Sequence, residues 1–335
     1  MAGCEESFGF YFIFVLLTYL LWMDLSFFDE LAVYGSNYNS TVASKMMFPV
    51  KSVKLRMTEH IDHYINLPLM ELSEEKLGIS SIPGITPNVI SAFHFFCAVI
   101  SCKFAISEHL AFRRIGCVIY EFRNQLDLLD GVVYRAQAHK KTFVSGWGSS
   151  GYLVDAAMDF GGGLLMAFSL GVFLHRFPPL KKVRIRKDVE AGVGLLSEHY
   201  PTKPEKTTYS FVHVDRRTIT ITVLMAVIQV IGRSGFWDHF VRSYHELLEL
   251  PNPHYPKELQ AEVLNYRSTW LVMWLWKISS ADAFFQFTLL AMLFDKSWVW
   301  LKMVFYIGWF QIAGVIALSQ LHLMEVRAYL NAAAL

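Results

Sequence analysis

The sequence predicts an all-α, polytopic membrane protein from its composition, its hydropathy pattern and the charges of its loops. Of the 335 residues, 54% are hydrophobic and only 18% are charged, with a mean hydropathy of +0.34. Soluble domains usually carry about 25% charged residues. Seven apolar windows reach the roughly 20 residues that cross a bilayer. They lie at about 8–28, 88–108, 113–133, 155–175, 218–236, 269–294 and 297–319.

The first window, 8–28, predicts a retained transmembrane helix. Asp24 alone interrupts it, and Glu5 and Glu6 stand where a cleavable signal peptide carries basic residues. The chain as a whole has a net charge of +1. It therefore lacks the basic field that would favour nucleic acid as a partner.

The loop charges predict the orientation. The connector 176–217 carries ten Lys and Arg residues, whereas the loop 237–267 carries three. Because positive charge is retained on the cytoplasmic side, 176–217 is expected there, and 29–87, 134–154 and 237–267 on the opposite side. The sequon at Asn39 lies in 29–87 and agrees with this orientation. Whether Asn39 carries a glycan is left open.

Four carboxylates lie at the meeting ends of the third and fourth windows. Asp127 and Asp130 are three residues apart, and Asp155 and Asp159 are four apart. On helices, each pair shares one face. Since the third window ends on the side where the fourth begins, all four side chains are expected to converge.

Such a group of like charges needs compensation, because an aspartate inside a membrane helix costs about 2.5–3.5 kcal/mol. Two divalent cations would cancel the four charges, and oxygen ligands suit Mg²⁺ or Mn²⁺. Paired ions of this kind serve displacement at phosphorus. The alternative from another class is a cation transporter. It predicts polar positions along several spans, whereas these acids gather at one membrane face.

Three further residues fit a phosphorylated ligand. Gly131 and Gly151 leave room for a close approach of the backbone. Arg135 follows Asp130 by about one turn, where its guanidinium can bind a diphosphate in a bidentate manner. The other interpretation of Arg135 is a residue that reaches towards the membrane interface.

The stretch 127–159 resembles the signature of the CDP-alcohol phosphotransferases, D-x2-D-G-x2-A-R-x8-G-x3-D-x3-D. Every Asp, Gly and Arg of the signature has a counterpart here. Tyr134 replaces the small Ala, and the spacer before Gly151 has fifteen residues. The sequence Thr86-Pro87-Asn88 is also similar to the start of the family's first core helix. The resemblance implies a six-helix core plus one N-terminal transmembrane helix. It divides the chain into 1–80, a catalytic membrane domain at 81–320, and a C-terminal tail at 321–335.

Within this family, the Tyr before the Arg and the longer spacer resemble the ceramide phosphoethanolamine synthases of invertebrates. The resemblance implies CDP-ethanolamine as donor, ceramide as acceptor, CMP as leaving product and two Mn²⁺ or Mg²⁺ ions. It also implies a Golgi membrane with the site facing the lumen. The alternative is an ethanolamine- or cholinephosphotransferase that acts on diacylglycerol, since both lipids present a primary hydroxyl. The oligomeric state is left open, with a homodimer among the options.

The resemblance also assigns roles to single positions. Asp127, Asp130 and Asp155 would hold the metal pair, and Asp159 would complete the second ion's shell and act as general base. The implied substrate contacts are Gly131, Arg135, Gly151 and Asn88.

Two features stay open at this point. Lys277 and Asp282 lie within the sixth window, 269–294, and either line an acceptor cavity or pair with another helix. The spacer 136–150 is expected to be a loop, either a cover over the donor with Trp147 as a stacking partner or a plain connector.

Overall fold

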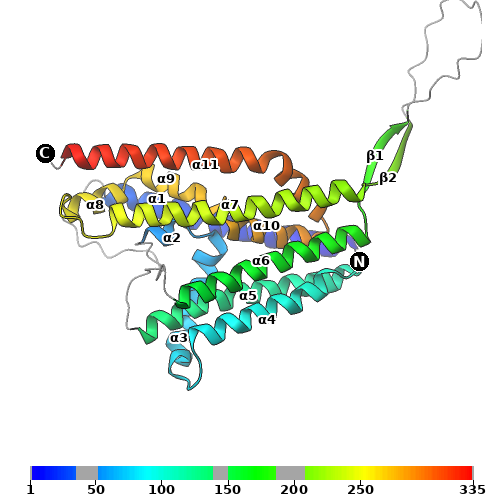
Figure 1. Cartoon of the computed structure of the whole chain (residues 1–335), viewed down its shortest axis with the longest axis horizontal. Coiled ribbons are helices and arrows are strands. Elements are labelled where there is room, and N and C mark those ends of the chain that lie inside the picture. Colours follow the sequence, from blue (N-terminus) through cyan, green and yellow to red (C-terminus); the bar gives the residue numbers. More distant parts are fainter. Residues whose placement is uncertain (1, 35–51, 139–149, 186–207, 334–335) are drawn as a thin grey trace, which may run out of the picture.

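The computed structural model describes residues 2–34, 52–138, 150–185 and 208–333. Long helices run side by side along one axis (Figure 1). The N-terminus and a short β-hairpin lie at one end of this bundle, and the C-terminus lies at the other. The helices are α1 (Ala2–Tyr34), α2 (Val53–Met57), the π-helix η1 (Asp62–Asn66), α3 (Leu67–Leu77), the 3-10 turn η2 (Ile79–Ser81), α4 (Pro87–Ala105), α5 (Leu110–Gln137), α6 (Ser150–Arg176), α7 (Arg216–Leu248), α8 (Lys257–Leu264), α9 (Arg267–Lys277), α10 (Ala281–Leu293) and α11 (Ser297–Ala333).

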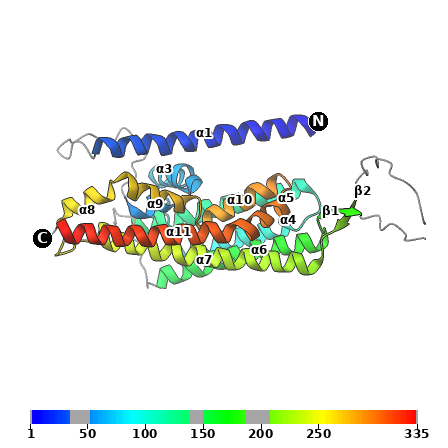
Figure 2. The ribbon, with the colours of Figure 1, turned by 90° about the horizontal axis from the view of Figure 1, so that it is seen from above.

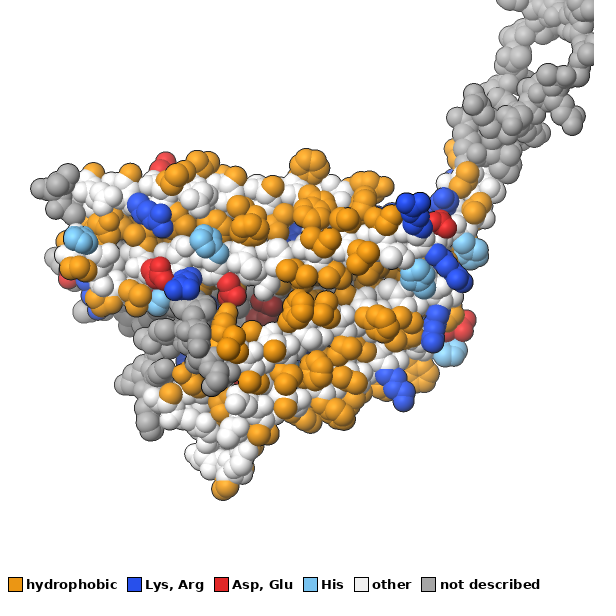
Figure 3. All heavy atoms as spheres, in the orientation of Figure 1, with side chains coloured by type: hydrophobic (Ala, Val, Ile, Leu, Met, Phe, Trp, Pro, Cys, Tyr) orange, Lys and Arg blue, Asp and Glu red, His pale blue; other side chains and the backbone are white. Residues whose placement is uncertain are grey.

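The predicted helical membrane protein is confirmed at this level. Within the described ranges, four helices are long and apolar enough to cross a bilayer: α4, α6, α7 and α11. Hydrophobic side chains cover the flank of the bundle, while Lys, Arg and His side chains gather towards its ends (Figure 3). This distribution is typical of a protein whose flank faces lipid. Helix α11 continues to Ala333, through most of the segment 321–335 that the sequence assigned to a tail.

The window 269–294 is wrong as one continuous span. The structure divides it into α9 and the short helix α10. The break has a local cause, because the Ser280 hydroxyl accepts a hydrogen bond from the backbone N–H of Ala283 and caps α10. Ser279 and Ser280 are both buried at this break.

The segment 29–87, expected as a polar segment on the side of the membrane opposite to 176–217, contains helices that pack into the bundle. Val53 and Met57 of α2 are fully buried in the core formed with α7, α9 and α11. The Trp237 indole N–H donates to the carbonyl of Met57 at 2.9 Å. The buried Arg56 donates to the carbonyl of Leu264 and to the side chain of Asn265. The described part of this segment, from residue 52 onwards, therefore belongs to the folded core.

Helix α1 forms a layer beside the bundle (Figure 2) and is held there by a buried carboxylate. Asp24 accepts hydrogen bonds from the Tyr64 hydroxyl at 2.7 Å and the Trp274 indole at 2.7 Å, and His60 lies 2.8 Å away. A charge inside an apolar helix is tolerated when it has such partners. Asp24 therefore fixes α1 against η1 and α9.

The structure adds one element to the all-α prediction. Strands β1 (Leu180–Ile185) and β2 (Thr208–His213) pair antiparallel, with Leu180 opposite His213. They form a hairpin that projects from the bundle end next to α6 and α7 (Figure 1). The predicted basic connector 176–217 thus contains strands as well as residues outside the described ranges.

Candidate metal centre and cavity

The predicted carboxylates come from α5 and α6, which pack with α4 into one group of helices. Asp127 and Asp130 lie on α5, and Asp155 and Asp159 lie on α6. Gly162 of α6 lies against Arg123 of α5, since a Cβ at this position would be in van der Waals contact with the guanidinium at 3.4 Å. The helical spacing within α5 and α6, and the packing of both helices on α4, bring the acids towards one another.

Three of these acids meet around a histidine that sequence analysis missed. Ligand atoms of His94, Asp127, Asp155 and Asp159 all lie within 4.8 Å of one another. His94 comes from α4 and is fully buried. One Asp155 oxygen is buried and makes no hydrogen bond among the described residues. The donor set, three carboxylates and one imidazole with unsatisfied atoms, fits a divalent metal.

Asp130 lies beside this group and has a different partner. The Ser91 hydroxyl donates to its carboxylate at 2.6 Å, and His94 Nε2 is 4.0 Å from it. Asp130 is buried. It therefore lies next to His94 as well, but its carboxylate is engaged by Ser91 of α4 and is not part of the group of converging ligand atoms.

Arg123 is a second residue that sequence analysis missed. Its guanidinium pairs with Asp159, and it lies 4.0 Å from Asp127. The side chain is buried and lies over the Tyr120 ring. A signal was present in the sequence, because an Arg four residues before Asp127 shares its helix face. Arg123 supplies positive charge to the acid cluster.

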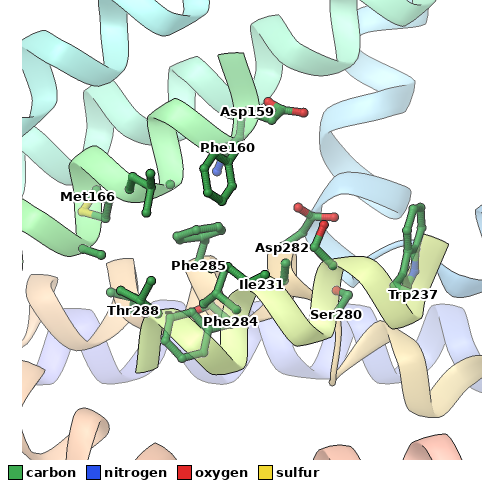
Figure 4. A pocket seen from close by; sticks show the side chains of 18 of the residues that line it. Asp159, Phe160, Met166, Ile231, Trp237, Ser280, Asp282, Phe284, Phe285 and Thr288 are labelled. Atoms are coloured by element: carbon green, nitrogen blue, oxygen red, sulfur yellow. Dashed lines mark hydrogen bonds between the residues drawn. The ribbon is translucent and has the colours of Figure 1, made fainter. Parts of the chain in front are cut away.

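A cavity of about 260 Å³ opens from the acid cluster. Its polar walls carry Asp127, Asp155 and Asp159 from one side and Asp238 and Asp282 from the other. Asp159 and Asp282 approach the same space from α6 and α10, with Phe160 and Phe285 beside them (Figure 4). Acidic side chains are visible in the hollow on the surface of the bundle (Figure 3).

Most of the remaining lining of the cavity is apolar. They extend between α6, α7 and α10 and end at Leu301 of α11. One cavity thus joins a carboxylate-rich end to a hydrocarbon-lined end. The apolar part is formed by Phe160, Leu164, Met166, Ala167, Leu170, Val223, Ala226, Val227, Val230, Phe284, Phe285 and Leu301.

The N-terminal segment also contributes to the polar walls. Lys54 of α2 and Asp62 of η1 line the cavity. Asn66 donates to Asp62 at 2.8 Å and to Glu121 of α5 at 2.8 Å. Burial raises the pKa of Asp62 above its usual value, and the nearby Glu59 raises it further. The sequence patterns predicted no site residue in this segment.

The other predicted site residues lie near the start of α4 and the outer ends of α5 and α6. A Cβ at Gly151 would lie 4.0 Å from the Asn88 amide oxygen, so these two residues are neighbours. Arg135 is 3.9 Å from Glu71 of α3, and a Cβ at Gly131 would lie 3.4 Å from Arg135. None of these four positions is among the cavity-lining residues of the described chain.

Lys277 and Asp282 lie in different environments. Lys277 is buried, with its Nζ 2.5 Å from His63 Nδ1 and lying over the Tyr64 ring. Asp282 lines the cavity. The spacer residues 139–149, including Trp147, and the sequon at Asn39 lie outside the described residues.

Fold and site together define a polytopic membrane protein with an acidic, metal-competent centre at the polar end of an amphipathic cavity. The ceramide phosphoethanolamine synthase family model matches residues 36–333, so the chain belongs to this family. The chain is also similar to the ceramide phosphoethanolamine synthase of Drosophila melanogaster. The two are 28% identical over 282 residues, which cover 83% of this chain and 69% of that protein. Family membership makes the chain a transferase of sphingolipid synthesis and confirms the resemblance drawn from 127–159.

Proposed function

We propose that the chain transfers phosphoethanolamine from CDP-ethanolamine to the primary hydroxyl of ceramide, giving ceramide phosphoethanolamine and CMP. One observation carries the proposal. The convergent group Asp127, Asp155 and Asp159 lies at the polar end of a cavity whose other end is apolar. A water-soluble, anionic donor and a lipid acceptor can therefore meet at one place.

The acids would hold the divalent metal that the family chemistry requires. Asp127, Asp130 and Asp155 would hold a pair of divalent ions, and Asp159 would complete the second ion's shell. When bound, the metal supplies positive charge for the diphosphate and for the departing CMP. Preorganised charge of this kind is the main contribution to catalysis of phosphoryl transfer.

Asp159 would act as the general base. It lines the cavity and is therefore accessible to an acceptor hydroxyl. The hydroxyl oxygen forms a bond to the β-phosphorus of the donor while the bond from that phosphorus to the CMP oxygen breaks. The hydroxyl proton passes to Asp159, and CMP leaves. Arg123, paired with Asp159, would orient the carboxylate for this transfer.

The cavity also offers positions for the two other parts of the substrates. Asp238 and Asp282 would face the ammonium group of ethanolamine, which needs a negative partner once it leaves water. The apolar walls around Met166 and Leu170 would cover a hydrocarbon chain of ceramide. Gly131, Arg135, Gly151 and Asn88 would contact the cytidine diphosphate near the outer ends of α4, α5 and α6.

The proposed location is a Golgi membrane with the site facing the lumen. Strands β1 and β2, which belong to the basic connector 176–217, lie with the N-terminus at one end of the bundle, and the C-terminus lies at the other (Figure 1). Positive charge retained in the cytoplasm then favours a cytoplasmic N-terminus. An Asn39→Gln variant tests this orientation, because a lumenal Asn39 predicts a mobility shift that glycosidase removes from wild type only.

The function is tested with purified protein, labelled CDP-ethanolamine, and either ceramide or diacylglycerol, in Mn²⁺ or Mg²⁺. We expect a labelled product with ceramide, and loss of CMP release in Asp155→Asn and Asp159→Asn. Asp215→Asn is the control, because Asp215 caps α7 at the other end of the bundle. A preference for diacylglycerol would overturn the acceptor assignment, and full activity of both site variants would overturn the site.

A further inference from the structure

His94 is buried against the acid cluster without a hydrogen bond of its own. Its exposed fraction is 0%, and neither ring nitrogen has a hydrogen-bond partner among the described residues. Nε2 lies 3.7 Å from Asp127 and 4.0 Å from Asp130, which is beyond hydrogen-bonding distance. The imidazole is nevertheless within the 4.8 Å group that contains Asp127, Asp155 and Asp159.

This arrangement is unfavourable unless something else occupies the centre of the group. A buried polar atom without a partner is destabilising, and each neighbouring carboxylate repels the others. Arg123 compensates Asp159 and lies farther from Asp127. A cation between the imidazole and the carboxylates would satisfy the ring nitrogen and the unpaired oxygen of Asp155 together.

We propose that His94 is a nitrogen ligand of the metal held by Asp127, Asp155 and Asp159. The inference rests on the proposed function only in placing a metal at this site. An imidazole ligand changes which ion is preferred. Carboxylate oxygens suit Mg²⁺, whereas a nitrogen donor favours first-row transition ions. His94 therefore favours first-row transition ions over Mg²⁺, and Mn²⁺, which also accepts carboxylate oxygens, is the ion chosen as the probe.

The direct test is pulsed electron paramagnetic resonance of Mn²⁺ bound to the full-length protein in lipid nanodiscs. A coordinated imidazole produces a nitrogen-14 coupling on the Mn²⁺ signal. We expect this coupling in wild type, and its replacement by the nitrogen-15 pattern after labelling of histidine alone. Bound Mn²⁺ without any histidine coupling would overturn the inference. This measurement needs no variant, so it does not depend on whether a variant folds.

A variant pair assigns the coupling to one residue. His94→Gln should lose the coupling and weaken Mn²⁺ binding by about tenfold or more, measured from the signal of free Mn²⁺. Mg²⁺ binding, measured by competition, should change much less. His109→Gln is the matched control, because His109 is exposed in the turn between α4 and α5. Unchanged coupling and affinity in His94→Gln would refute the assignment.

The inference and the proposed function can fail separately. If the purified protein prefers diacylglycerol, the acceptor assignment falls, while a histidine coupling still supports His94 as a ligand. If CMP release depends on Mn²⁺ but Mn²⁺ carries no histidine coupling, His94 is not a ligand and the proposed reaction stands.

Discussion

Replacing Arg123 by Gln tests whether this residue compensates the acid cluster. The substitution leaves Asp159 and Asp127 without their nearest cation. Removing one partner of a buried pair costs about 3–5 kcal/mol. The Asp159 and Asp127 side chains are 40% and 27% exposed. Because water in the cavity screens both charges, we expect a smaller loss of about 2–3 kcal/mol.

The loss should depend on metal. At about 2 °C per kcal/mol for a chain of this length, the melting temperature of Arg123→Gln should fall by roughly 4–6 °C without divalent ions. A bound cation takes over the compensation, so saturating Mn²⁺ should remove at least half of the difference. A thiol-reactive fluorogenic dye reports unfolding, since Cys97, Cys102 and Cys117 are buried free thiols.

The control for Arg123→Gln is Arg242→Gln. Arg242 pairs with Glu246 on the surface of α7, with exposed side chains on both sides. Arg242→Gln should therefore change stability by no more than about 0.5 kcal/mol, with or without metal. If Arg123→Gln loses the same stability in the presence and absence of Mn²⁺, Arg123 has a packing role and does not compensate the acids.

Three further predictions concern the polar residues around the cavity and α1. Asp24→Asn should lower the melting temperature by several degrees, because it weakens the hydrogen bonds from Tyr64 and Trp274. Asp29→Asn, at an exposed position of the same helix, should leave the melting temperature unchanged. Burial raises the pKa of Glu59 to about 8, so between pH 5 and 8 this side chain keeps its proton in the folded protein and loses it in the unfolded chain. The stability of the wild-type protein should therefore fall as the pH rises from 5 to 8. Glu59→Gln should make this fall smaller. Asp282→Asn should raise KM for CDP-ethanolamine and reduce its preference over CDP-choline in competition assays, with unchanged preference contradicting the headgroup role.

The parts of the site that were predictable depend on short-range helical geometry. Asp127 with Asp130, and Asp155 with Asp159, are three and four residues apart, and the third apolar window ends on the side of the membrane where the fourth begins. Periodicity alone therefore places them on shared faces at one membrane side. Three of the four do meet in the structure. Asp130 differs because Ser91, on another helix, provides its hydrogen bond.

The residues that were missed reach the site through tertiary contacts. His94 is an isolated histidine in an apolar helix, and nothing in its neighbourhood specifies which face of α4 meets α5 and α6. Lys54 and Asp62 belong to a segment whose polarity resembled that of a loop. The break in 269–294 was hidden for a similar reason, because the cap at Ser280 adds little polarity to an apolar window. Long-range packing decides all of these cases.

Asp24, the one charge within the first apolar window, connects helix α1 to the wall of the cavity. Asp24 would be costly in lipid, and the structure satisfies it with Tyr64 of η1. The same π-helix carries Asp62 into the cavity wall and ties it through Asn66 to Glu121. Since one turn of η1 connects both sets of contacts, displacement of α1 would disturb the cavity wall directly. Asp24 therefore has a structural role in the site, because it allows α1, which lies beside the bundle, to support the cavity wall through η1.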